Sequence, residues 1–168
     1  MSLLMVMFSN FIAAQNSSQC PCCTPEHRQF DFWVGEWETF SSQGLAGTNS
    51  IVIMEDSCVI QENWVSAKGG YTGTSYNFYD QTEKKWKQIW VDNQGGNLEL
   101  TGNFVDGKMV LQSEEKYSEK NKVHYTDRIT WTPNSDGTVR QYWQRTTDGG
   151  KTWSDIFDGL YKPKAKKE

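Results

Sequence analysis

The stretch KWKQIWVD, residues 85–92, alternates in chemical character from one residue to the next. Successive side chains of a β-strand point to opposite faces of the sheet. Lys85 and Lys87 belong in water, so they mark their face as the outer one. The opposite face combines aromatic rings with an amide and a carboxyl group, namely Trp86, Gln88, Trp90 and Asp92. This stretch therefore predicts a strand whose inner side is both aromatic and polar.

The chain after Pro25 continues as short alternating runs separated by turn-forming segments. The pair Asp106-Gly107 joins two such runs and is a strong signal for a tight hairpin. Residues 24–34 are the one helix candidate, because Thr24 can cap a short helix and Pro25 suits its first position. Many short strands in sequential hairpins predict an all-β sandwich or barrel.

Of these two, we expect an antiparallel up-and-down barrel of about eight to ten strands with a short N-terminal helical lead-in. Closing the meander into a barrel removes its exposed edges. Aromatic residues make up 14% of the chain, so rings supply much of the core volume. A barrel of this size leaves room for one small ligand.

The first fifteen residues, MSLLMVMFSNFIAAQ, form a short apolar run that ends in small residues. This pattern is typical of a secretory signal peptide. No Lys or Arg precedes the run, and a helix docked on the domain is the alternative. The run is too short to span a bilayer, so no stable membrane insertion is expected. We predict a signal peptide over 1–15, a Cys-rich leader over 16–25, a barrel over 26–161 and a basic tail over 162–168.

The cysteines and the net charge limit the compartments and the partners that are expected for this protein. An even number of cysteines in an exported protein predicts disulfides among Cys20, Cys22, Cys23 and Cys58, and a secreted or periplasmic location. Pairing Cys58 with one of the other three would staple the leader to the domain. A zinc site is the alternative, although the Cys-x-Cys-Cys spacing is not typical of one. The net charge of -4 argues against a nucleic-acid partner.

Gly35-Glu36-Trp37, after a short helical lead-in, resembles the signature of the calycin superfamily. The ordered set FDFWVGEW, SCVIQENW, SYNFYD, KWKQIWVD, RITW, VRQYW and DGGKTW resembles more closely an exported bacterial family that carries FDFWxGEW near its start. This resemblance spans roughly Glu26 to Tyr161 and implies a lipocalin-like barrel. It further implies that Trp37 closes one barrel end and can stack on a basic side chain, for which Arg128 is the candidate. It implies no particular ligand or activity.

Two further features follow from resemblance. Thr146 to Trp153 is similar to an Asp-box, so Asp148 is expected to accept turn N–H groups while Trp153 packs over the loop. Some small barrels of the calycin superfamily bind haem through one histidine, which makes His124 a candidate ligand. No other feature supports haem, and no cofactor is otherwise predicted. His27, in the lead-in, is expected at the surface.

Alternation in the other strands extends the inner face that residues 85–92 define. The strand VRQYWQR places Arg145 on the same face as Gln141 and Trp143, and DRITW is read with Arg128 inside. The candidate ligand-binding residues are Glu62, Trp64, Asn77, Tyr79, Trp86, Gln88, Trp90, Arg128, Gln141 and Trp143.

So many buried polar groups need partners. One interpretation is an internal network in which Glu62 pairs with Arg128 and the core is filled. The other is a cavity in which indole rings stack on an aromatic or planar small molecule. A third hypothesis is an isomerase- or lyase-type enzyme, with Glu62 and Arg128 as its candidate catalytic residues.

We expect the mature chain to begin near Gln15 or Asn16, with Cys58 oxidised, because an apolar leader and an even number of cysteines indicate export. Intact-mass analysis of the protein from its own host, alkylated with and without prior reduction, measures both properties. Retention of Met1 together with four free thiols would contradict the prediction.

Overall fold

The structure is a computed structural model in which residues 20–165 are described. The predicted signal peptide, residues 16–19 of the leader and residues 166–168 of the basic tail lie outside the described residues. Between residues 20 and 165, no helix has the length and apolar character needed to cross a membrane.

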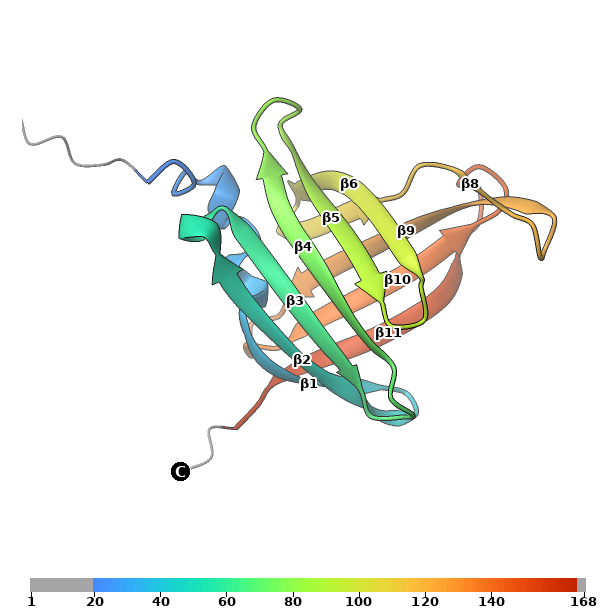
Figure 1. Cartoon of the computed structure of the whole chain (residues 1–168), viewed down its shortest axis with the longest axis horizontal. Coiled ribbons are helices and arrows are strands. Elements are labelled where there is room, and N and C mark those ends of the chain that lie inside the picture. The colour runs from blue at the N-terminus through green and yellow to red at the C-terminus, as the bar shows by residue number, and fades with distance from the viewer. Residues whose placement is uncertain (1–19, 166–168) are drawn as a thin grey trace, which may run out of the picture.

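Short 3-10 turns and β-strands account for the regular structure of the described residues (Figure 1). In chain order they are η1 (Glu26–Arg28), η2 (Asp31–Trp33), β1 (Gly35–Ser41), β2 (Gly44–Met54), η3 (Glu55–Ser57), β3 (Val59–Ser66), β4 (Thr72–Asp80), β5 (Lys85–Asp92), β6 (Asn97–Val105), β7 (Lys108–Gln112), β8 (Lys116–Ser118), β9 (Val123–Pro133), β10 (Val139–Thr146) and β11 (Ser154–Pro163).

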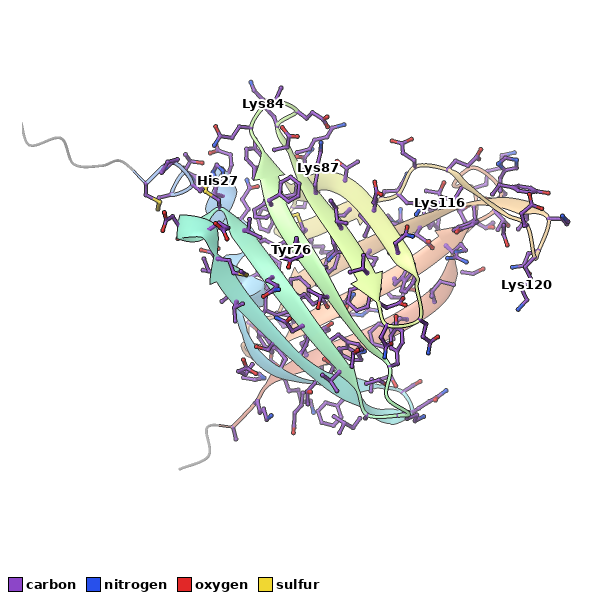
Figure 2. All side chains as sticks on the ribbon, in the orientation of Figure 1. His27, Tyr76, Lys84, Lys87, Lys116 and Lys120 are labelled. Atoms are coloured by element: carbon purple, nitrogen blue, oxygen red, sulfur yellow. A yellow bond between two sulfur atoms is a disulfide. The ribbon has the colours of Figure 1, made fainter. Side chains whose placement is uncertain are left out.

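Ten of these strands form a closed antiparallel barrel, which confirms the predicted fold class. Each strand from β1 to β6 pairs with the next, β7 then pairs with β9, and the meander continues through β10 to β11. Pairing of β11 with β1 closes the barrel. Strand β8 pairs with β9 in a hairpin that projects from the barrel and carries Lys116 and Lys120 (Figures 1 and 2).

An aromatic plug fills the end of the barrel at which β1 begins. Phe30 and Trp33 come from the lead-in, which lies against this end (Figure 1), and both are fully buried. Their rings stack at a centroid distance of 4.9 Å, and Phe30 meets Trp131 of β9 edge-on at 5.2 Å. Trp37 is 5% exposed, and its Nε1 donates to the Trp33 carbonyl oxygen at 2.9 Å. The plug therefore joins the lead-in to the barrel wall by ring packing and a buried hydrogen bond.

Two side chains differ in position from the sequence-based expectation. Arg128 does not stack on Trp37. Its guanidinium lies 3.8 Å from the centre of the Trp153 ring, on the outside of the barrel. His27 is not at the surface but is 3% exposed. It is buried because its ring packs edge-on against Tyr79 at 5.3 Å, while Thr24 Oγ1 lies 2.9 Å from its Nδ1.

One disulfide holds the leader against the barrel, and a second lies within the leader. Cys22 pairs with Cys58, next to η3, and Cys20 pairs with Cys23. The expected link between Cys58 and the N-terminal cysteines is therefore confirmed, and no cysteine is left free to bind zinc.

The two turns singled out in the sequence have clear physical roles. Asp106 and Gly107 both adopt positive φ, 50° and 76°, as a two-residue hairpin between β6 and β7 requires. In the loop after β10, Asp148 Oδ1 accepts the Thr152 N–H at 2.9 Å. Trp153 Nε1 donates to the Gly150 carbonyl at 3.2 Å and so pins the ring over the loop.

Trp37→Ala is expected to lower the free energy of unfolding by about 3–5 kcal/mol, because it leaves a cavity in the plug. Chemical denaturation followed by circular dichroism measures the change. Tyr117→Ala is the matched control, since this ring is 46% exposed on β8 and its loss should change stability by no more than about 0.5 kcal/mol. Equal denaturation midpoints for wild type and Trp37→Ala would show that the plug does not stabilise the fold.

Candidate ligand-binding site

A layer of polar side chains crosses the barrel beside the plug. We call it the polar belt; its members are Asn49 of β2, Glu62 of β3, Ser75 and Asn77 of β4, and Gln88 of β5. They are neighbours because the register opposes Glu62 to Ser75 and Asn77 to Gln88. All are buried, and they share the inner face with Ile51, Ile60 and Trp86 of the core.

Hydrogen bonds connect the belt from strand to strand. Asn49 Nδ2 donates to Glu62 Oε1 at 2.7 Å, and Ser75 Oγ donates to Glu62 Oε2 at 2.6 Å. Asn77 Nδ2 donates to Ser75 Oγ at 3.0 Å, and Gln88 Nε2 donates to Asn77 Oδ1 at 2.8 Å. The donors of these side chains are therefore used within the belt.

Tyr161 of β11 extends the belt across the barrel. Asn49 Nδ2 lies 3.2 Å from the Tyr161 hydroxyl, which in turn donates to Gln141 Oε1 on β10. Burial, together with the nearby Glu62 carboxyl, raises the pKa of Tyr161 well above its usual value. This phenol therefore stays protonated and acts as a hydrogen-bond donor.

Glu62 is an unusual member of the belt, because a buried carboxylate normally has a cationic partner. It is 5% exposed, and no ion pair among residues 20–165 includes it. Burial raises the pKa of Glu62, while the hydrogen bonds from Ser75 and Asn49 act in the opposite direction. Asn49 Oδ1, beside it, is buried without a hydrogen-bond partner.

The end of the barrel opposite the plug is lined by aromatic rings, and we call it the mouth. Trp64, Trp90, Trp143 and Phe157 all lie on inner-face positions of their strands, yet each is only partly buried. A Cβ added to Gly73 would lie 2.1 Å from the Trp90 ring, and one added to Gly47 would lie 2.6 Å from the Trp64 ring. Glycine at these two positions therefore lets both indole rings lie flat against the neighbouring strand.

A hollow of about 370 Å³ lies at the mouth end of β3, β4 and β5. Its lining includes Trp64, Gly73 and Asp92 from the inner face, together with Val65 and Val91 from the outer face. A second hollow, of about 410 Å³, lies over β1, β10 and β11 and contains the Arg140–Asp158 ion pair. Of the two, the first has one of the mouth rings, Trp64, in its lining.

The cation at the mouth is Arg145, on the inner face of β10. Its Nε and Nη2 donate to the two carboxylate oxygens of Asp127 at 2.8 and 2.9 Å. Trp143 Nε1 also donates to Asp127 Oδ1, at 2.9 Å. The guanidinium lies 4.0 Å from the centre of the Tyr125 ring. Its positive charge is therefore already balanced within the protein.

The expectation that Arg128 lines the interior is corrected by the structure. Asp127 and Ile129, on either side of it, are buried, so Arg128 points outward. There it donates to Gln144 Oε1 at 2.9 Å and packs on Trp153. Glu62 and Arg128 consequently lie on opposite sides of the barrel wall, and the structure does not support them as a catalytic pair.

The remaining sequence-predicted site residues divide among three places. Glu62, Asn77, Gln88 and Gln141 lie in or beside the belt, and Trp64, Trp90 and Trp143 lie at the mouth. Trp86 and Tyr79 belong to the plugged end, where Trp86 Nε1 donates to Gln29 Oε1 at 3.2 Å. His124 lies on the projecting hairpin, with its side chain 64% exposed and Nδ1 3.1 Å from Glu115 Oε1.

Sequence reasoning missed Asn49, Tyr161, Asp127 and Phe157. Asn49 and Phe157 lie in strands whose alternation was not used to assign an inner face. Asp127 was assigned to the wrong face together with the register of β9. The run VRQYWQR already contained the signal for Arg145, since it put this residue beside Gln141 and Trp143.

No protein-family model matches the chain, and no curated protein matches it either. The architecture defines it as a closed antiparallel β-barrel with a buried aromatic cluster, which is compatible with a lipocalin-like fold.

Glu62→Gln keeps the shape of this side chain and removes its charge. Because the pKa of Glu62 is raised above its ordinary value of 4.5, the folded protein binds this proton more tightly than the unfolded chain does. Wild type therefore loses stability as the pH rises above 4.5, and Glu62→Gln does not share that loss. We expect the free energy of unfolding, variant minus wild type, to increase between about pH 4 and about pH 7 in urea denaturation. A constant or decreasing difference would contradict a raised pKa.

Proposed function

We propose that this protein binds a small molecule with an aromatic or planar part at the mouth of the barrel. One observation carries the proposal: the inner-face rings at the mouth are all partly exposed, whereas those at the other end include the buried Trp37, Trp86 and Trp131, against which Tyr79 and Phe104 pack partly buried. Since the mouth rings face inward, solvent reaches them through the mouth. A ligand that replaces this solvent would stack on indole rings.

The packing of the plugged end also favours entry of a ligand through the mouth. Phe30, Trp33 and Trp131 are fully buried there, and the Cys22–Cys58 disulfide holds the leader in place. Opening this end would break the packing of these buried rings. A ligand therefore meets less resistance at the mouth.

We also propose that the protein works outside the cytoplasm, in the periplasm or after secretion. Its four cysteines form two disulfides, which persist in oxidising compartments. Membership of the exported family with the FDFWxGEW motif belongs to this proposal as well and is supported by the barrel architecture.

A structural domain with a filled core is the second candidate. The observation that favours it is the polar belt, in which Asn49 and Ser75 donate to Glu62 and Asn77 donates to Ser75. A network of this kind can specify a unique core without any ligand.

The dye N-phenyl-1-naphthylamine, which brightens in apolar surroundings, distinguishes the two candidates. We expect wild type to bind it, and Trp64→Leu to weaken binding by about two- to ten-fold, because a ring-stacking contact is lost. Tyr76→Leu is the matched control, since this ring is 45% exposed on the outer face of β4 (Figure 2). Fluorescence titration gives the dissociation constants. Equal weakening by both variants would place the dye on the outer surface, and no binding to wild type would favour the filled core.

A further inference from the structure

We infer that the site at the mouth selects a ligand that carries an ammonium or a similar cationic hydrogen-bond donor, and that Glu62 receives this group. The inference rests on the proposed function and adds the chemical class of the ligand. An interior Arg128 would instead have favoured an anionic ligand, but Arg128 lies on the outside of the barrel.

The charges on the inner face support a cation. Asp127 and Arg145 balance each other in a two-pronged ion pair, with distances of 2.8 and 2.9 Å. Asp92, at the rim, turns into its own loop, where Oδ1 accepts the N–H groups of Gln94 and Gly96 at 2.9 Å each. Among the inner-face carboxyl groups of the described residues, Glu62 is the one that has no cationic partner and accepts no N–H group from a loop.

The hydrogen-bonding capacity of the belt also favours a ligand with a cationic donor group. The amide N–H groups of Asn49 and Gln88 and the hydroxyl of Ser75 donate inside the belt, and Asn77 Nδ2 donates to Ser75 and to the Ile60 carbonyl. Asn49 Oδ1 is left without a partner, and each carboxylate oxygen of Glu62 accepts one bond although it can accept more. The unpartnered indole N–H groups of Trp33 and Trp131 belong to the plug instead, and the unpartnered hydroxyl of Thr39 lies on β1, opposite Tyr161 rather than Glu62. The belt therefore has acceptors to offer and needs a donor.

The aromatic rings above the belt add to this preference. Glu62 precedes Trp64 by two residues on the same face of β3, which is a separation of about 7 Å along the strand. A ring stacked at the mouth can therefore bring an ammonium on a two-carbon arm toward the carboxylate. On the way, the faces of Trp64 and Trp90 attract a cation and disfavour an anion.

Three probes that share one ring system test the inference: 2-(2-naphthyl)ethylamine, 2-(2-naphthyl)ethanol and 2-naphthylacetate. They are cationic, neutral and anionic near neutral pH, and calorimetry or ligand-observed NMR gives their dissociation constants. We expect the amine to bind wild type at least several-fold more tightly than the alcohol, and the acetate to bind most weakly. Glu62→Gln should weaken binding of the amine, so that the ratio of the amine's affinity to the alcohol's falls from several-fold to about one. Glu99→Gln, which removes a charge from an exposed position of β6, should keep the wild-type order.

The outcomes separate this inference from the proposed function. Equal binding of all three probes, or a preference for the amine that survives in Glu62→Gln, overturns the inference and leaves the binding site in place. Binding of none of them overturns both. Intermolecular NOEs from the amine's CH₂ groups to the side chains of Asn49 and Ser75 provide a readout on wild type, in case Glu62→Gln does not fold. Absence of these NOEs with a bound amine would also overturn the inference.

Discussion

Pairing of β1 with β11, the first and last strands of the barrel, is the constraint on which the rest of the structure depends. Trp37 opposes Pro163 and Phe40 opposes Leu160, so the sheet has no free edge at this point. In a closed barrel every strand residue faces either inward or outward, and a shift by one residue exchanges the two sets. Register therefore decides that Glu62 is buried, although a glutamate by itself prefers water.

The barrel separates stability from recognition along its axis. Rings packed around Phe30 close one end, and the lead-in that carries this residue is tied to the wall by the Cys22–Cys58 disulfide. Next to the plug, the belt holds polar groups that would each cost about 1–3 kcal/mol if they were buried without partners. At the mouth, Trp64 and Trp90 keep contact with solvent. The side chains best placed to meet a ligand are thus those that contribute least to the plug.

Local sequence patterns were sufficient to predict the fold and part of the candidate site. Alternation over residues 85–92 identified the inner face of β5, since lysines and aromatic rings differ strongly in their preference for water. The Asp106-Gly107 hairpin and a link from Cys58 to the leader were also readable, because each depends on few residues. The belt was visible only in part, as its Asn49–Glu62–Ser75 connection needs the register of three strands.

The assignment of the two arginines failed for a different reason. Strand β9 carries polar residues on both faces, so alternation alone does not say whether Asp127 or Arg128 lies inside. The answer comes from other elements: Arg145 on β10 supplies the partner that lets Asp127 be buried, and Trp153 beyond β10 offers Arg128 an aromatic surface outside. Neither contact is local in sequence. Arg145, the cationic side chain on the inner face, is already paired with Asp127, so it does not neutralise Glu62. The inner surface therefore keeps an acidic group that Arg128 was expected to balance.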